Sequence, residues 1–430
     1  MDTNKKFYGW TLLAVMFSVY FIASMVTYGG SVAASHMAKT TGMSGTLFGV
    51  GFTINFIAAG FGGTVAAIMA AYIGERKVIS IGMVVVTIGC LVMYAAGETP
   101  VGYIVAFGFF VGGGATFATF VPMQTMITRW FVKRRALATG IVMSSGGFAG
   151  AIVSPLANFI IEESGDWRTF WIFISILSFA SIFIGYRWIR NAPQDVGQFP
   201  DGDTPESIAY DQSDAPAHAK MPPSSVYRTT YDWSLRELLK VSTLWHMIIL
   251  SILSGAATFM VLANGVVHLL DRGLDGNIAA LSLGIVTFAS IGGRLLAGIL
   301  GDRFEPRYLL MIALLLQTIG ISFIVQADNI WYVYIYAGLT GLGFGMGLVS
   351  QFTMMGNFFG PTYFKNILGF MMPITTLGAA MSPLIAGIVR DSTGSYEYPF
   401  MAAVVCAALA GIGTIFLRPP VKADAEVATS

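Results

Sequence analysis

Charged residues are scarce in this chain of 430 residues. Asp, Glu, Lys and Arg make up 11% of it, whereas an ordinary soluble protein has about 25%. Hydrophobic residues make up 55%. Such a chain cannot cover its folded surface with polar groups in water, but a bilayer removes that need. The formal net charge is +1, so no excess of one sign points to nucleic acid as a partner.

Motifs for metal binding, ATP hydrolysis and catalysis are also missing. The two cysteines, Cys90 and Cys406, lie in apolar runs and the four histidines are scattered, so neither a disulfide framework nor a metal site is expected. No G-x-x-x-x-G-K-[ST] loop occurs. No cluster of catalytic residue types lies inside an apolar run. We therefore expect no cofactor and no enzymatic activity.

Long apolar runs, by contrast, are abundant. A membrane-spanning helix needs roughly 20 mostly apolar residues. Twelve runs approach or exceed this length, at residues 8–34, 46–73, 78–96, 101–128, 136–161, 167–189, 242–269, 278–300, 307–327, 330–356, 365–389 and 398–417. The sequence therefore predicts an all-α membrane protein with twelve transmembrane helices.

The runs fall into two groups of six. Residues 190–241 between them are rich in proline and acidic residues without an apolar period, which is typical of a flexible linker. We assign residues 1–189 to an N-terminal half and residues 242–430 to a C-terminal half. Near the end of the linker, residues 233–240 have the pattern of a short amphipathic helix on the membrane surface.

The two halves repeat each other in the same direction. Ser-Pro-Leu at 154–156 corresponds to Ser-Pro-Leu at 382–384, and Gly165 corresponds to Gly394. Two matches in register make chance recurrence the weaker interpretation. A parallel pseudo-repeat of two six-helix halves places the binding site near the midplane, where the halves meet.

The distribution of Lys and Arg predicts the orientation. With the N-terminus inside, nineteen of the 24 Lys and Arg residues lie in inner segments, four lie in outer loops and one lies within a run. Cytoplasmic loops carry an excess of Lys and Arg. We therefore expect both termini in the cytoplasm and a multi-pass protein in the cell membrane.

Arg294 is the Lys or Arg that lies within a run. A charge at the bilayer centre costs at least about 2.5–3.5 kcal/mol, unless it faces water or an anion. The guanidinium matches a carboxylate in shape, so we predict that Arg294 binds an anionic substrate. Snorkelling is disfavoured because Asp302, at the inner end, is about 12 Å further along the helix. Pairing with an acid is disfavoured because all 23 Asp and Glu lie in loops, tails or run ends. Backbone carbonyl partners remain an alternative.

Other polar residues in the apolar runs are further candidates for substrate contacts, with less support from the sequence than Arg294. Isolated polar side chains in such runs more often bond across helices. The candidates are Tyr28, Asn55, Gln124, Asn264 and Gln351. His268, near the outer end of the seventh run, is a candidate proton site because its reference pKa is about 6.5. The alternative for His268 is a position at the level of the lipid headgroups.

One inner loop resembles a motif of a known family. Residues 298–307, Gly-Ile-Leu-Gly-Asp-Arg-Phe-Glu-Pro-Arg, resemble the G-x-x-x-D-R-x-G-x-R motif of the major facilitator superfamily, except at Glu305. In the corresponding loop after the second run, Ala71 stands where the motif has Asp. The resemblance implies an asymmetric conformational latch. Its residues would be Asp302, Arg303, Arg307 and Arg76.

A second stretch resembles one branch of that family. Residues 129–140, Arg-Trp-Phe-Val-Lys-Arg-Arg-Ala-Leu-Ala-Thr-Gly, are similar to the W-F-x-x-[KR]-R-x-x-A-x-G pattern of the monocarboxylate porters and oxalate/formate exchangers. In that branch the arginine at the position of Arg294 binds the substrate carboxylate. The exchangers' lysine in the eleventh span corresponds to Thr375, which favours a monoanion. The aspartate of animal porters corresponds to Ser290, so the acid of their proton-coupling pair is absent.

The resemblance implies a secondary transporter of a small monocarboxylate such as lactate or pyruvate. It would work by alternating access, through proton symport or exchange. The alternatives are a carrier of another organic anion (oxalate, formate or an aromatic acid) or of a drug-type solute, and a receptor or membrane-embedded enzyme on a similar scaffold. We expect a small organic anion, protons and the lipid bilayer as partners, and a monomer.

Overall fold

The computed structural model describes residues 6–43, 45–203, 226–229 and 231–420. In this part of the chain twelve helices are long and apolar enough to cross a membrane, and no β-strand is present. The predicted all-α architecture with twelve spans is therefore confirmed. The stretch 204–225 of the predicted linker, together with residue 230, lies outside the described residues.

Six spans form the N-terminal half. The first three are α1 (Gly9–Thr41), α2 (Gly45–Ile73) and α3 (Glu75–Ala96). The fourth is assembled from α4 (Pro100–Tyr103), a π-helical segment η1 (Ile104–Val111), α5 (Gly112–Ala118) and α6 (Phe120–Trp130). The last two are α7 (Arg135–Ser164) and α8 (Arg168–Trp188).

The fourth span is broken near its middle. Thr119, between α5 and α6, has φ −123° and ψ −95°, outside the helical region. Pro122 follows three residues later and lacks the N–H that would bond to the carbonyl of Ala118. The proline therefore accounts for the break between α5 and α6.

Six further spans form the C-terminal half. They are α11 (Ser242–Asp271), α12 (Gly276–Leu300), α13 (Pro306–Val325), α14 (Ile330–Phe359), α15 (Phe364–Thr393) and α16 (Glu397–Phe416). The described parts of the linker contain two 3-10 turns, η2 (Pro193–Val196) and η3 (Pro200–Gly202), and the short helix α10 (Leu235–Leu238).

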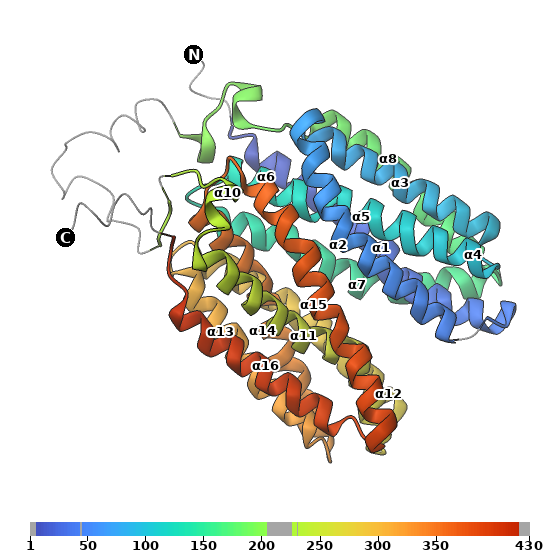
Figure 1. Cartoon of the computed structure of the whole chain (residues 1–430). Coiled ribbons are helices and arrows are strands. Elements are labelled where there is room, and N and C mark those ends of the chain that lie inside the picture. Colours follow the sequence, from blue (N-terminus) through green and yellow to red (C-terminus); the bar gives the residue numbers. More distant parts are fainter. Residues whose placement is uncertain (1–5, 44, 204–225, 230, 421–430) are drawn as a thin grey trace.

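The two halves meet at one end of the bundle and diverge toward the other (Figure 1). We call the first end, which holds α10 and the loop between α6 and α7, the linker end, and the opposite end the far end. The helices of the two halves pack along two pairs, α7 with α12 and α2 with α15. In the second pair Thr64 Oγ1 donates a hydrogen bond to Gly369 O.

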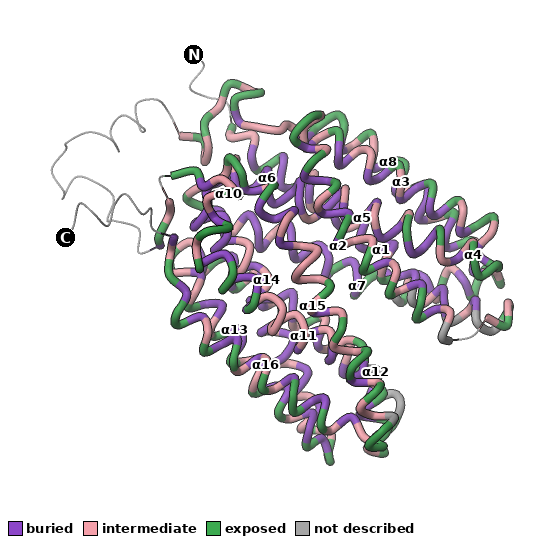
Figure 2. The backbone as a smooth tube through the Cα atoms, in the orientation of Figure 1, coloured by how far each residue is buried: buried purple, intermediate pink, exposed green. Residues whose placement is uncertain are grey.

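Buried residues follow the inner faces of the helices, and exposed residues follow the outer faces (Figure 2). Many exposed side chains are nevertheless large and apolar, including Ile176 and Phe183 on α8 and Phe416 on α16. A water-soluble protein rarely exposes apolar area on this scale, whereas lipid covers it. The outer surface thus fits a bilayer.

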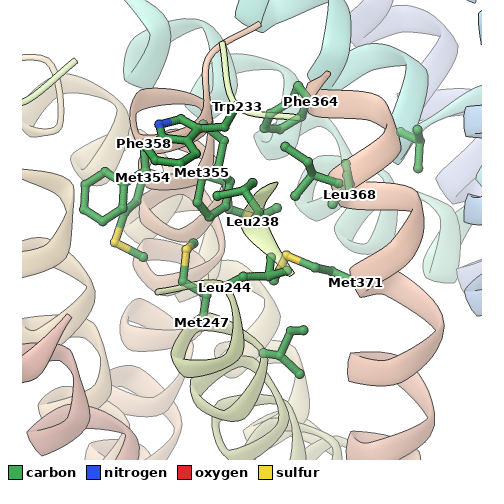
Figure 3. Close-up of a cluster of buried hydrophobic side chains, with 14 of the residues drawn as sticks. Trp233, Leu238, Leu244, Met247, Met354, Met355, Phe358, Phe364, Leu368 and Met371 are labelled. Atoms are coloured by element: carbon green, nitrogen blue, oxygen red, sulfur yellow. The ribbon is translucent and has the colours of Figure 1, made fainter. Parts of the chain in front are cut away.

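The segment around α10 packs inside the protein. Ser234 caps the helix, since its Oγ accepts a hydrogen bond from Glu237 N. Trp233 and Leu238 are buried in a cluster that includes Phe358 at the end of α14 (Figure 3). The helix is thus shorter than the amphipathic helix predicted for residues 233–240, and its apolar side chains contact the C-terminal half.

Candidate functional site

Close backbone contact between α7 and α12 brings the two halves together around Arg294. A Cβ added to Gly140 on α7 would lie 2.7 Å from Arg294 O and 2.9 Å from Gly298 Cα. Any side chain at this position would push the helices apart, so the glycines permit the approach. Arg294 therefore lies on α12 at the surface where the halves meet.

The Arg294 side chain is buried, with 4% of its surface exposed. Its Nη1 donates a hydrogen bond of 2.8 Å to Met143 O on α7, across the halves. Its Cζ lies 5.5 Å from the ring centroid of Phe344 on α14. Nε has no hydrogen-bond partner among the described residues. A buried, unpaired charge-bearing donor is costly, which makes it a strong site for an anion.

No carboxylate of the described residues forms an ion pair with Arg294. The sequence disfavoured snorkelling and pairing with an acid, and kept backbone carbonyl partners as an alternative. In the structure it bonds to a backbone carbonyl. That bond leaves the positive charge without a counter-ion.

Two glycines of α7 make room for groups beside this guanidinium. A Cβ at Gly146 would lie 3.4 Å from Ser24 Oγ, 3.6 Å from Arg294 Nη1 and 3.7 Å from Tyr20 Cζ. A Cβ at Gly147 would lie 3.2 Å from Arg294 Nη1. Tyr20 and Ser24 of α1 thus converge with Arg294 around the same glycine. Two hydroxyl groups and one guanidinium can together bind a carboxylate.

Tyr28 continues this row of α1 toward the far end. Its ring lies 3.4 Å from the position of a Cβ on Gly150, one turn beyond Gly146. Tyr20, Ser24 and Tyr28 are four residues apart, so they share one face of α1. Sequence reasoning selected Tyr28 but missed Tyr20 and Ser24. The regular spacing was the signal that could have found them.

Aromatic rings continue from Tyr20 across the boundary between the halves. The rings of Tyr20 and Phe120 make an edge contact with centroids 5.7 Å apart. Phe120 in turn lies 6.1 Å from Phe352 on α14. Phe120 is the first residue of α6, directly after the break at Thr119. This row of rings begins at Tyr20, which shares the space beside Gly146 with Arg294, while Phe344 lies beside the guanidinium itself.

Two of the amides predicted as substrate contacts are each bonded inside one half of the protein. Asn55 Nδ2 donates to Phe107 O at 2.8 Å within the N-terminal half. Gln351 Nε2 donates to Ser251 Oγ within the C-terminal half. Both therefore bond between helices of their own half.

The two other predicted amides, Asn264 and Gln124, differ in whether their NH2 groups have a hydrogen-bond partner among the described residues. Asn264 Nδ2 lies 3.5 Å from Met260 Sδ, one turn earlier on α11. Gln124 is 1% exposed, and its Nε2 has no hydrogen-bond partner among the described residues. Gln124 therefore has a buried donor that a ligand or a water molecule can satisfy.

His268 is enclosed by helices of the C-terminal half. Its Nε2 lies 3.1 Å from Ile324 O on α13. Its ring is 4.7 Å from the ring of Phe400 on α16, centroid to centroid. The side chain is 1% exposed. In this conformation His268 is thus held by its own half.

Asp302 joins the halves at the linker end. Its Oδ1 accepts a hydrogen bond from Ala136 N at 2.8 Å, and its Oδ2 accepts one from Leu137 N at 3.1 Å. These N–H groups lie in the first turn of α7, where helix N–H groups lack helical partners and attract an anion. Burial raises the pKa of Asp302 to about 6, although the two hydrogen bonds act in the opposite direction.

The other predicted latch residues have different surroundings. The guanidinium of Arg76 lies 4.2 Å from the ring centroid of Tyr186, within the N-terminal half. Arg307 Nη1 donates to Leu417 O at 3.1 Å, within the C-terminal half. Arg303 is exposed next to Asp302. Asp302 is thus a predicted latch residue with defined hydrogen bonds across the halves.

Glu75 makes a second contact between the halves, which sequence reasoning missed. It is 2% exposed and accepts from Arg129 Nη1 at 3.0 Å within its own half. Lys365 Nζ, at the start of α15, lies 3.4 Å from its other oxygen. Glu75 lies four residues after Ala71, beyond the turn at Gly74, and is the first residue of α3. The loop therefore has an acid, but not at the motif position. The presence of a glutamate so close to the motif position was the sequence feature that could have predicted this contact.

The relatives of this chain are transporters. The model of the family described as the Major Facilitator Superfamily matches residues 16–299 and 269–429. Monocarboxylate transporter 2 of Meriones unguiculatus is 24% identical over 363 residues, covering 82% of this chain and 72% of that protein. Monocarboxylate transporter 13 of Rattus norvegicus is 23% identical over 376 residues, covering 86% of this chain and 79% of that protein.

Solved structures with the same fold are also transporters. The transporter FucP in the outward conformation superposes with a TM-score of 0.72 at 12% identity, over 95% of this chain and 99% of that one. The proton:xylose symporter XylE gives a TM-score of 0.73 at 15% identity, over 96% of both chains. With its two halves of six spans and a family match over most of its length, the chain belongs to the major facilitator superfamily.

Proposed function

We propose that this protein is a secondary transporter that binds a small monocarboxylate at Arg294 and moves it by alternating access. The observation that carries the proposal is a buried guanidinium between the halves with no carboxylate partner among the described residues. A bound monocarboxylate would neutralise this charge and satisfy the open Nε donor. The names of the curated relatives agree with a cargo of this class.

The position of Arg294 supports alternating access. It bonds to the opposite half through Met143, so the carboxylate site would include groups of both halves. Asp302 and Glu75 bond the halves together at the linker end, while the helices diverge at the far end (Figure 1). Rocking of the halves about the site would exchange these two arrangements. We propose the Asp302 and Glu75 contacts, with Arg303, Arg307 and Arg76 nearby, as the latch of the present arrangement.

We infer the orientation and the coupling from the chain's own charges. The excess of Lys and Arg in the inner segments assigns the linker end to the cytoplasm and the far end to the outside of the cell membrane. A proton carried with the anion gives symport, and a second anion carried in return gives exchange. His268 is the candidate proton site, and its use would require its contact with Ile324 O to break.

The rings near Arg294 favour a second candidate cargo within the same chemical class. Tyr20, Phe120, Phe344 and Phe352 would surround the body of a bound acid with apolar surface. A monocarboxylate with an aromatic body would gain packing against these rings. A dianion such as oxalate would leave one negative charge without a cation.

Uptake by the purified protein in liposomes tests the proposal. Labelled lactate, pyruvate, an aromatic monocarboxylate and oxalate are supplied in turn, with and without an imposed pH gradient. We expect a monocarboxylate to be taken up and oxalate to be excluded. Stimulation by an inward proton gradient would identify symport, whereas stimulation by internal unlabelled acid would identify exchange. Absence of flux for every monocarboxylate would refute the proposal.

A further inference from the structure

The second part of the linker is bonded to the C-terminal half. Tyr227 N donates a hydrogen bond of 2.8 Å to Glu305 Oε2, in the loop between α12 and α13. Thr229 N donates one of 2.8 Å to Asn357 O, near the end of α14. Two backbone groups on either side of residue 228 are therefore fixed to this half.

Arg228 reaches from this anchored segment to the other half. Its Nε donates to Val132 O at 2.9 Å, and its Nη2 donates to Lys133 O at 3.2 Å. Both carbonyls belong to the loop between α6 and α7 of the N-terminal half. Hydrogen bonds from a charged donor are among the stronger ones in proteins. One side chain of the linker thus holds a loop of the opposite half.

The first part of the linker holds the same loop by its N–H groups. The carboxylate of Asp201 accepts from Val132 N at 2.9 Å, Lys133 N at 2.8 Å and Arg134 N at 3.4 Å. Asp201 has φ 58°, a left-handed conformation that is uncommon for a residue with a Cβ. The loop is therefore bonded on both sides, by Asp201 through its N–H groups and by Arg228 through its carbonyls.

We propose that residues 226–229 act as a clasp that stabilises the conformation closed at the linker end. The bonds of Arg228 and those of Tyr227 and Thr229 coexist only while the α6–α7 loop and the α12–α13 loop stay together. Opening of the linker end separates these loops and breaks one set of bonds. This inference rests on the proposed exchange between two conformations, but not on the identity of the cargo.

Distance measurements at the far end test the clasp. In a full-length protein with Cys90→Ala and Cys406→Ala, spin labels are placed by Val101→Cys on α4 and Trp331→Cys on α14, both of which are well exposed. Pulsed electron paramagnetic resonance then gives the populations with a long and a short label distance. Arg228→Ala should increase the short-to-long population ratio about tenfold, because two charge-assisted bonds of the linker-end-closed form are lost.

Arg236→Ala is the matched control. It removes the same charge from the same linker, but Arg236 is exposed and makes no hydrogen bond or ion pair among the described residues. Its population ratio should equal that of the parent protein. A ratio in Arg228→Ala equal to that in Arg236→Ala would overturn the clasp.

A second variant tests the clasp independently, in case Arg228→Ala does not fold. Glu305→Ala removes the acceptor of Tyr227 N on the opposite anchor, so it should shift the ratio in the same direction. If Arg228→Ala is not monodisperse, an unchanged ratio in Glu305→Ala overturns the clasp. The experiment is carried out without any monocarboxylate cargo. A failure of the proposed cargo would therefore appear in uptake assays and leave this ratio unaffected.

Discussion

Arg294 and Glu75 are both buried charges in contact with the opposite half, but their surroundings differ. Glu75 is 2% exposed and has two cationic partners, Arg129 and Lys365. Arg294 is 4% exposed, and its hydrogen bond goes to a neutral carbonyl. The charge at the linker end is therefore neutralised by the protein itself, whereas the charge between the halves is not. The comparison indicates a structural role for Glu75 and supports the proposed binding role of Arg294.

Replacing Arg294 should have the largest effect. We expect Arg294→Ala to reduce monocarboxylate uptake at least about 100-fold, because truncating one partner of a buried charge pair costs several kcal/mol. Arg294→Lys should also transport poorly, since an ammonium cannot donate two parallel bonds to a carboxylate. Uptake rates in liposomes, normalised to inserted protein, measure this. Wild-type uptake by Arg294→Ala would contradict the anion-binding role.

Replacing Glu75 should reduce stability. Glu75→Ala leaves Arg129 and Lys365 without their shared carboxylate, and breaking a buried pair costs about 3–5 kcal/mol. Unfolding in denaturing detergent measures the loss. The control is Glu98→Ala, which removes the exposed partner of Arg168 and should cost less than about 1 kcal/mol. Equal losses in the two variants would show that burial of Glu75 does not matter.

Tyr20→Phe tests the hydroxyl beside Arg294. We expect its KM for the monocarboxylate to rise up to about tenfold, the effect of one lost hydrogen bond, with protein stability unchanged. Tyr103→Phe is the matched control, because the buried Tyr103 hydroxyl has no partner among the described residues and belongs to the core of the N-terminal half. Concentration series of initial uptake rates measure both. The same KM in both variants would exclude the Tyr20 hydroxyl from the site.

We expect Asp302 to make the proposed latch depend on pH. Burial raises its pKa from 3.8 to about 6 in the closed arrangement, whereas solvent exposure on opening would return it toward the ordinary value. At pH values between these two pKa values the closed form binds more protons, so acidification from about pH 7 to pH 5 should stabilise the closed linker end up to about tenfold. The label pair on Val101 and Trp331 measures this population. Burial also raises the pKa of Glu305, which adds a change of the same sign.

Asp302→Asn removes the titrating charge of Asp302 and can keep one of its two hydrogen bonds. The amide oxygen can accept from Ala136 N or Leu137 N but not both, because the amide NH2 group is a donor, and the side chain no longer titrates. The pH response should therefore shrink to the part that Glu305 supplies. A response as large as that of the parent protein would assign the pH dependence to other groups.

The sequence predicted the features that depend on the order of residues along the chain. Apolar run lengths gave the twelve spans, because a bilayer demands a fixed length of each helix. Arg294 was predicted as a site residue because it is the one Lys or Arg inside an apolar run. The structure then showed that it lies between the halves. Its role in binding stays a prediction.

Features made by packing across helices were harder to predict. Apart from their spacing from Tyr28, nothing in the sequence distinguishes Tyr20 and Ser24 from other residues of an apolar helix. Their importance follows from the contact with Gly146 of α7, which only the structure shows. Glu75 lies four residues after the motif position, at the start of the next helix, whereas the motif pointed to Ala71. The bonds of Arg228 lie in an irregular segment, where no periodicity exists to indicate which groups meet.

The most direct test of the unbalanced guanidinium is equilibrium binding of a labelled monocarboxylate to the purified protein, without any transport step. The account predicts saturable binding that falls as ionic competitors are added, is at least about 100-fold weaker in Arg294→Ala, and is retained in Arg236→Ala. Equal affinity of Arg294→Ala and the parent protein would contradict it, because the cargo would then be held by other groups.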